Sequence, residues 1–389
     1  MQPPASFMDA YRPSLRGRRH MTAAGHYLAA QASFQVMEAG GNAIDGGVAA
    51  GMALGVVQSE LVGVAGVAPI IIYSAEEDRV VTISGLGTWP AATDPEFFTR
   101  EYPDSVPEGI LRCIVPGAPA AWIMALERYG SMTFGEVASA SIKLARDGFA
   151  MYALMAELLA EKAEKYARWD ANAEIYLPGG HSPKVGENFR QEDLGRSLQY
   201  MADCEAAAGG DRIAGLRAAR DAFYKGDIAR KISTYHEDNG GLIRMEDLAS
   251  FEVEVEDALR IDVAGTKVYS CGPWCQGPML LQIMQLLQGQ NLSGMGHNSA
   301  AYIHHVTEAV KLAVADRERW YGDPRFVDVP MDMLLSDDYA KQRRAMIDPE
   351  SAWPEMPPSG DPRAPRVEPS PTPLTALDTS YACVVDAKG

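Results

Sequence analysis

Apolar residues recur at helical spacing in the first organised block of the chain. This spacing covers residues 26–39 and stops at Gly40 and Gly41, because a helix commonly ends in the left-handed conformation that glycine adopts easily. Either Asn42 or Asp45 can cap the helix that follows, and the small residues of that helix allow its neighbours to approach closely. We therefore expect two successive helices, the second of them buried against a sheet.

Two short β-branched runs come next, at residues 68–73 and 80–84, with a polar turn between them. Such a pair predicts a β-hairpin, central to a sheet. Further helical patterns cover 116–148, 154–168, 276–287 and 299–320, and residues 259–270 return to a strand-like composition.

The composition limits what the chain can bind. Its 389 residues, 47% hydrophobic and 22% charged, can bury one large core or two ordinary ones. The formal net charge of -17 opposes binding to nucleic acid or to an anionic membrane, because like charges repel. No run approaches the roughly 20 uninterrupted apolar residues of a membrane span. We expect neither nucleic acid nor a membrane as a partner.

The cysteines and the N-terminal segment both favour a cytoplasmic location. The five cysteines are few, odd in number and widely spaced, which is typical of reduced thiols rather than of a disulfide framework. Several arginines precede Met21, but no apolar run follows them as it would in a signal peptide.

A threonine near the end of the chain is the candidate nucleophile. Residues 349–373 contain nine prolines and predict an extended linker, after which Thr379 opens an apolar, strand-like segment. Threonine is a good nucleophile chiefly as the first residue of a chain, where its own α-amine, with a pKa of roughly 8, can accept the hydroxyl proton. That chemistry requires cleavage between Asp378 and Thr379. Without further context, a threonine before a strand is simply a good β-former.

Several segments together resemble one known family over nearly the whole chain. Each segment alone is weak evidence, but together the segments keep the order and spacing found in that family. They are residues 38–50, 115–117, 223–229, 240–248, 315–317 and 322–324. The family they resemble is that of the γ-glutamyltransferases, also called γ-glutamyltranspeptidases.

This resemblance implies an α+β protein, the four-layer α-β-β-α sandwich of the N-terminal-nucleophile (Ntn) hydrolases. Such a protein is a zymogen that cleaves itself into a large and a small subunit. Residues 1–348 would then be the large-subunit part, 349–378 the linker before the cleavage site, and 379–389 the start of the small subunit. The implied partner is the protein's own small subunit, either as this pair or as a heterotetramer.

The resemblance also implies a mechanism. The Thr379 hydroxyl would attack the carbonyl of Asp378, and the resulting ester would be hydrolysed to free the amine. The same hydroxyl would then take the acyl group of a small amide and pass it to water or to an acceptor amine. Where the family has Thr-Thr-His, this chain has Thr379, Ser380 and Tyr381, so the last two are candidate substrate-binding residues.

Two other segments depart from the family's pattern. Leu86 stands where glutamate-binding members have an arginine for the substrate α-carboxylate, and Gly87 replaces the acidic residue that follows. Losing such a clamp costs on the order of 2 to 5 kcal/mol in a desolvated site, which favours a neutral or apolar acyl group. Alternatively, Leu86 belongs to the core and Arg112 supplies the clamp. The glycine-rich loop of the family also carries side chains here, at residues 63–69, which predicts a reshaped pocket.

Three functions are therefore open. The first is an amidohydrolase or acyltransferase that is not strictly γ-glutamyl specific, and the second is a true γ-glutamyltransferase or glutathione hydrolase. The third is a non-catalytic large-subunit fragment that binds a partner. Only eleven residues follow Asp378, and the family's oxyanion donors lie beyond that point, so the site is expected to need the rest of a small subunit.

We expect no cofactor and no metal. His304 and Glu308 share a helical face but lack a third ligand, and Cys271 and Cys275 have one residue too many between them for a common redox motif. Four charged residues are instead predicted to form a structural ion-pair network around the long helix: Glu308, Asp316, Arg317 and Asp323.

Overall fold

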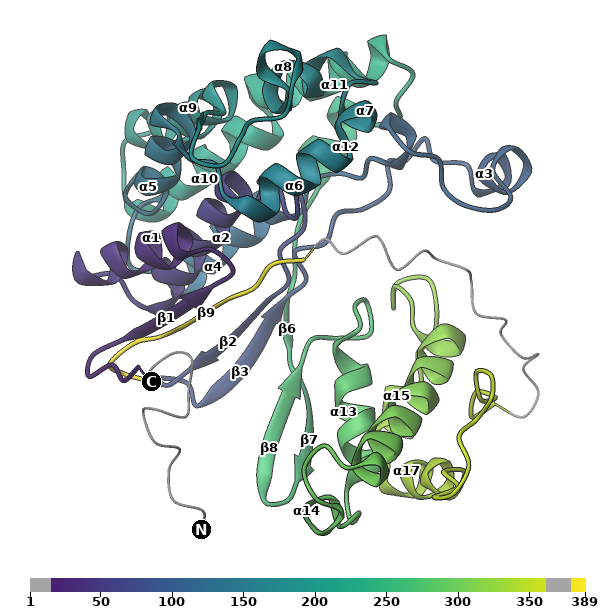
Figure 1. The fold of residues 1–389 in the computed structure, drawn as a ribbon. Helices are drawn as coiled ribbons and strands as arrows, with labels where there is room; N and C mark the ends of the chain where they lie inside the picture. Colours follow the sequence, from purple (N-terminus) through teal and green to yellow (C-terminus); the bar gives the residue numbers. More distant parts are fainter. Residues whose placement is uncertain (1–14, 362–378) are drawn as a thin grey trace. The chain divides into compact units, whose positions relative to one another are not determined.

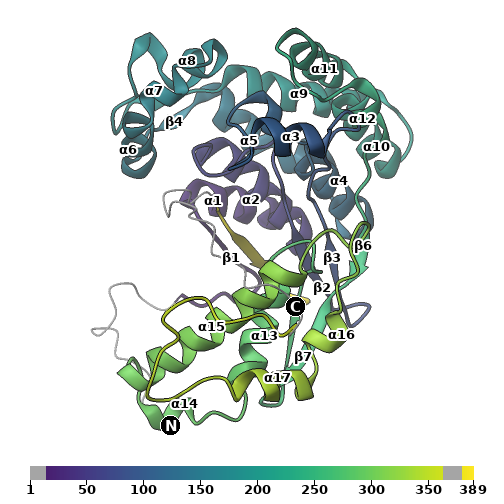
Figure 2. The same cartoon turned by 90° about the vertical axis from the view of Figure 1, so that its right-hand side faces the viewer.

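The computed structural model describes residues 15–361 and 379–389, which form two compact units. The described part of the first unit consists of residues 15–68, 85–253 and 379–389, and that of the second of residues 69–84 and 254–361. Figures 1 and 2 show the helices and strands of each unit from two directions.

The first two helices of the first unit are as predicted. Helix α1 covers Tyr27–Glu38 and ends before Gly40, whose φ is 106°. Helix α2 covers Ala43–Val57, and both predicted caps act together in a capping box between Asn42 and Asp45. Most of α2 is buried, because its small residues let α1 and other neighbours approach its backbone.

A two-stranded antiparallel sheet joins the two ends of the described chain. Strand β1 (Met21–Ala24) pairs with β9 (Ala382–Val385), and Figure 1 shows them side by side. Ala24 and Ala382 on the inner face pack against a buried cluster from α1 and α2. The opposite face is exposed, and we call it the β1–β9 outer face: Met21, Ala23, Tyr381, Cys383 and Val385.

The remaining elements of the first unit are mostly helices. The predicted helical pattern at 116–148 contains α4 (Ala118–Tyr129) and α5 (Phe134–Asp147), and the pattern at 154–168 contains α6 (Ala153–Glu161) and α7 (Ala163–Tyr166). The other elements are α3 (Pro95–Glu101), α8 (Asp170–Tyr176), α9 (Glu192–Ala207), α10 (Arg212–Tyr224), α11 (Asp227–Asp238), α12 (Met245–Ser250), the paired strands β4 (Phe149–Ala150) and β5 (Asn188–Phe189), and two 3-10 helices at Ile110–Arg112 and Pro178–Gly180.

The second unit contains the predicted hairpin and, within the strand-like residues 259–270, a second one. Strands β2 (Ile70–Ser74) and β3 (Arg79–Ile83) form the first, and β6 (Val255–Asp257) pairs with β3, which makes β3 the middle strand. Strands β7 (Leu259–Val263) and β8 (Thr266–Ser270) form the second. The helices are α13 (Gly277–Leu287), α14 (Leu292–Met295), α15 (Ala300–Trp320), α16 (Met331–Leu334) and α17 (Asp337–Arg344), and α13 packs against both α15 and α17.

The charged residues of α15 form separate pairs rather than the single predicted network. Asp316 and Arg343 make a fully buried pair at 3.1 Å, and Glu308 accepts from Lys311 Nζ at 2.6 Å. Arg317 pairs with its neighbour Glu318, and Asp323 pairs with Arg325. The buried pair ties α15 to α17, because neither charge can be left alone inside the unit.

The first part of the predicted linker packs against the second unit. The Trp353 N–H donates to Glu308 Oε2 at 3.3 Å, and the Gly360 N–H donates to Asp316 Oδ1 at 2.8 Å. Residues 349–361 therefore lie against α15, because its buried carboxylates need donors that the helix cannot supply. The remainder, 362–378, lies outside the described residues, and the predicted boundaries at 348 and 378 stay predictions.

Within residues 15–361 and 379–389, no helix has both the length and the apolar character needed to cross a bilayer.

Candidate active site

Thr379 is exposed and leads directly into the β1–β9 sheet. Its predicted cleavage partner Asp378 lies outside the described residues. The residues that follow Thr379 are held by the first unit, so they can orient it.

Ser380 is held through its side chain. Its Oγ donates to Oε1 of Gln58 at 2.6 Å. Gln58 is the C-cap residue of α2 and is only 5% exposed. Its Nε2 donates to the carbonyl of Gly25 at 3.4 Å, and the Gly25 N–H donates to the carbonyl of Tyr381 at 3.0 Å. Ser380 and Tyr381 are thus fixed to the start of the chain, while the Tyr381 ring remains 70% exposed.

A group of half-buried polar side chains lies next to Gln58. The Tyr152 hydroxyl donates to Oε1 of Glu60 and also contacts the side chain of Gln58. Burial raises the pKa of Glu60, and burial together with the hydrogen bond to Glu60 raises the pKa of Tyr152. The His26 ring lies 4.8 Å from the Tyr152 ring, and burial lowers the pKa of His26.

Gln58, Glu60 and Tyr152 are not among the site residues predicted from the sequence. A usable signal was present, because Gln58, Ser59 and Glu60 are three consecutive polar residues directly after the apolar end of α2. Polar groups that follow a buried helix usually have specific partners, since leaving them unpaired is costly.

The end of β9 is fixed by Asp386 and Val384. Oδ2 of Asp386 accepts from the N–H of Ala43 at 3.0 Å, at the N-terminus of α2, where the helix favours a negative charge. The Val384 side chain lies close to Gly46 on the same helix, where a β-carbon would come within 3.3 Å of it. This arrangement explains why the segment after Thr379 needs both an apolar strand and an acidic residue at its end.

Leu86 and Gly87 lie in a second tightly packed segment. The Ala68 N–H donates to the Gly85 carbonyl at 2.9 Å, and the Val115 N–H donates to the Thr88 carbonyl at 2.9 Å. A β-carbon on Gly87 would overlap the carbonyl oxygen of Val115, so this backbone has no room for the acidic residue of the family's pattern. Leu86 is half-buried, with part of its side chain accessible.

Arg112 already has partners away from Thr379. Its side chain is exposed, and its Nη2 donates to the carbonyl of Val106 at 2.6 Å. It also contributes, after Lys165 and Arg168, to the lowered pKa of Glu108. Its role as a substrate clamp stays a prediction.

The predicted site residues therefore form separate groups. Ser380 and Tyr381 lie against Gln58 and Gly25, whereas Leu86 and Gly87 lie against residues 114–117. Within the part of the chain that the structure describes, no hydrogen bond joins these groups.

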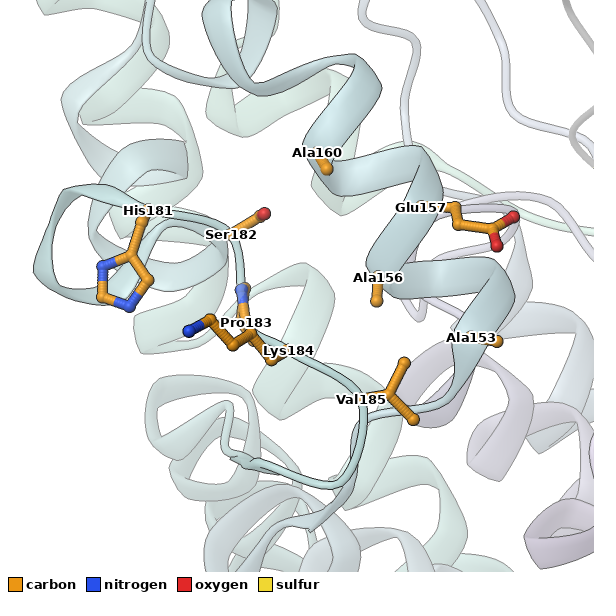
Figure 3. A pocket seen from close by; sticks show the side chains of 9 residues that line it. All are labelled: Ala153, Ala156, Glu157, Ala160, His181, Ser182, Pro183, Lys184 and Val185. Carbon is orange, nitrogen blue, oxygen red and sulfur yellow. The ribbon is translucent and has the colours of Figure 1, made fainter.

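A hollow of about 460 Å³ lies elsewhere in the first unit, between α6 and the segment at 181–185 (Figure 3). Three alanines line the α6 side, and Pro183 and Val185 line the other. It contains none of the predicted site residues, and although Ser182 and His181 also line it, the His181 ring contacts the Gly179 carbonyl at 3.3 Å. We do not assign it to catalysis.

The residues considered for a metal site and for a redox motif have contacts of their own. His304 Nε2 contacts the Asp348 carbonyl at 2.7 Å. The Glu308 carboxylate accepts from Lys311 Nζ and from the Trp353 N–H. Over the described ranges, no three His, Cys, Asp or Glu side chains gather closely enough to hold a metal. The thiols of Cys271 and Cys275 are hydrogen-bonded to each other, which lowers the pKa of Cys275 to about 7.

A glycine-rich buried helix, flanked by a strand that begins just after a threonine, belongs to the α+β fold of the N-terminal-nucleophile hydrolases. Comparison with known proteins defines the group further. The gamma-glutamyltranspeptidase model matches residues 29–389, and the chain belongs to that family.

Among curated relatives, the chain is 32% identical to an acylase ACY 1 proenzyme of Pseudomonas sp. (strain SE83), over 99% of this chain and 66% of the relative. It is 30% identical to a glutathione hydrolase proenzyme of Bacillus subtilis (strain 168), over 93% of this chain and 60% of that relative. The chain thus spans less than two thirds of the length of both relatives.

A crystal structure of Helicobacter pylori gamma-glutamyltranspeptidase superimposes with a TM-score of 0.81 at 29% identity. The match covers 89% of this chain and 97% of that chain. The fold class and family predicted from the sequence are therefore confirmed.

Proposed function

We propose that this chain supplies the large-subunit part and the nucleophile of an Ntn amidohydrolase or acyltransferase. The observation that carries the proposal is the placement of Thr379: it is exposed, and the two residues after it are held by Gln58 and Gly25. An N-terminal threonine needs this combination, because its oxygen must be accessible while its backbone is fixed.

Self-cleavage comes first in the proposed sequence. The Thr379 oxygen attacks the Asp378 carbonyl carbon, the C–N bond between them breaks, and the acyl group moves to the oxygen as an ester. Water then hydrolyses the ester, which leaves a carboxylate on Asp378 and a free amine on Thr379. In turnover, this amine accepts the hydroxyl proton during attack on a substrate amide, and the amine of the substrate leaves.

The acyl group is proposed to be neutral or apolar. Leu86 offers a partly accessible aliphatic surface, and Gly87 has no room for an acidic side chain, so neither can bind a charged amino-acid head group. The acylase relative supports an acylase activity that is not strictly γ-glutamyl specific. The glutathione hydrolase relative supports the second candidate, a true γ-glutamyl enzyme in which another residue binds the carboxylate.

The protein's small subunit is proposed to cover the β1–β9 outer face. Met21, Tyr381 and Val385 are 39%, 70% and 53% exposed there, which places three large apolar side chains along the same face in water. Further strands of a small subunit would bury this face and bring the oxyanion donors to Thr379. Assembly into a heterotetramer is part of the proposal, and gel filtration of the cleaved protein tests it.

Intact mass spectrometry of the protein with its small-subunit segment tests the function. We expect two chains divided before Thr379, together with turnover of a simple acyl amide. Thr379→Ala should abolish cleavage and turnover, whereas Thr379→Ser should retain both at a reduced rate. A single uncleaved chain with no acyl-enzyme would favour the non-catalytic alternative. The cytoplasmic location stays a prediction, which cell fractionation tests.

A further inference from the structure

The side chain of Gln58 has no structural duty at the end of α2. The helix ends there through the Gln58 backbone, whose N–H donates to the Leu54 carbonyl at 2.8 Å. Any residue could make that bond. The amide group is instead directed to Ser380 and Gly25, although it is nearly fully buried and lies 322 positions before Ser380 in the chain.

The neighbours of this amide determine which way it faces. Tyr152 uses its proton to donate to Glu60, so the Tyr152 oxygen is left to accept, and the carbonyl of Gly25 can only accept. Both contacts therefore require the NH₂ of Gln58. The Gln58 oxygen is left facing Ser380, and the Ser380 hydroxyl must donate to it.

The direction of this bond determines what Ser380 can offer its neighbour. Its proton is committed to Gln58, so the remaining lone pairs of its oxygen can only accept. Thr379 carries the donors that such an acceptor would orient: its hydroxyl before cleavage, and its α-amine afterwards.

We propose that Gln58 is a positioning residue for Thr379, acting through Ser380 in self-cleavage and in amide turnover. This inference rests on the proposed function of Thr379. A displacement of about 1 Å at a reacting atom can cost about 100-fold in rate. Removing the Gln58 acceptor is therefore expected to slow both steps by about 10- to 100-fold, with KM changed by less than about twofold.

Three variants disrupt the contact in different ways. Gln58→Leu removes the acceptor, and Ser380→Ala removes the donor. Gly25→Ala places a methyl group against both Ser380 Oγ and Gln58 Oε1, at a position without positive φ where alanine is otherwise acceptable. Ser380→Thr keeps the hydroxyl and should restore the rates lost in Ser380→Ala. The Gln58→Leu/Ser380→Ala double variant should be no slower than its slower parent, because both remove the same bond.

Gln191→Leu is the matched control. Gln191 is also buried in the first unit, and its Nε2 donates to the Val56 carbonyl at 2.7 Å without contacting Ser380. We expect it to lower thermal stability as Gln58→Leu does and to leave self-cleavage at the wild-type rate.

The experiment combines three measurements on the protein with its small-subunit segment. They are the time course of cleavage by intact mass, kcat and KM for an acyl amide, and amide hydrogen exchange of residues 379–386 in a Thr379→Ala background. Gln58→Leu should accelerate that exchange at least tenfold, and Gln191→Leu should not.

Wild-type rates in Gln58→Leu, or independent losses that multiply in the double variant, would overturn the inference. If the unmodified protein never cleaves, the proposed function fails, yet the exchange measurement still decides whether Gln58 holds the segment. Unchanged exchange would overturn the inference in that case too.

Discussion

The carboxylate of Asp386 caps a helix that begins 343 residues earlier, by accepting from the N–H of Ala43 at 3.0 Å. This contact joins the end of β9 to the N-terminus of α2. It adds a charge-assisted contact to the backbone pairing with β1 that holds the strand after Thr379.

Asp386→Ala should therefore destabilise the protein by about 1 to 2 kcal/mol, since it removes a charge-assisted hydrogen bond and a favourable helix-dipole contact. Urea unfolding measures the loss. Asp104→Ala, at an exposed aspartate far along the chain, is the control and should change stability by less than about 0.5 kcal/mol. Equal effects from the two variants would show that the cap contributes nothing.

Leu86→Arg should shift selectivity toward γ-glutamyl amides. Leu86 is half-buried, so a longer side chain can reach solvent or a substrate carboxylate, and a guanidinium binds a carboxylate with two parallel hydrogen bonds. We expect kcat/KM for a γ-glutamyl anilide to rise at least tenfold relative to a neutral acyl anilide with the same leaving group. Leu86→Lys adds a positive charge but cannot form two parallel hydrogen bonds, so it should raise the ratio of kcat/KM values by less. An unchanged ratio in both variants would place carboxylate recognition elsewhere.

Arg343→Met should destabilise the second unit by about 3 to 5 kcal/mol, because it leaves the buried Asp316 carboxylate uncompensated. Burial already raises the pKa of Asp316, and Arg343 opposes that rise. With the arginine removed, the folded state holds a proton that the unfolded state releases, so stability must fall as the pH rises above the unfolded pKa of about 4.

Urea unfolding of Arg343→Met between about pH 4 and pH 7 should show this fall more steeply than the wild type does. Adding Asp316→Asn should remove the extra pH dependence, because no titrating group remains at the site. A slope equal to that of the wild type would mean that Asp316 stays charged without its partner.

Cys275 should be the thiol whose alkylation depends most visibly on pH near neutrality. Its pKa is lowered to about 7, first by the hydrogen bond from Cys271 and then by the N–H of Gly277 at 3.3 Å. Since the thiolate is the reactive form, the iodoacetamide rate should reach half its maximum near pH 7. Peptide mass spectrometry measures the rate. Cys271→Ala should move the midpoint upward, and an unmoved midpoint would exclude the thiol pair as the cause.

The sequence predicted what local patterns control. The end of α1 and the start of α2 follow from Gly40 and from the capping pair Asn42 and Asp45, and the hairpin of β2 and β3 follows from two β-branched runs across a short turn. The family segments predicted the fold class, which the solved structure of a gamma-glutamyltranspeptidase confirms. The helix ends and the hairpin are each specified by residues within a few positions of them.

The contacts that the sequence did not predict join residues that are distant in the chain. Nothing local to Ser380 indicates Gln58, and nothing local to Asp316 indicates Arg343. Residues 349–361 look like a linker because of their prolines, but their backbone N–H groups satisfy buried carboxylates of α15. Proline content reports local stiffness, and it carries no information about which distant acceptors are unpaired.

The glycines of α2 have a consequence for the order of folding. Four glycines interrupt this helix, and each lowers intrinsic helix stability by about 1 kcal/mol relative to alanine. Its stability must therefore come from packing, and part of that packing is provided by Val384 and Asp386 at the far end of the sequence. During synthesis, α2 leaves the ribosome long before these partners exist. While the chain is still being translated, α2 therefore lacks part of its packing. Assembly of the cleavage site would wait until β9 has been made.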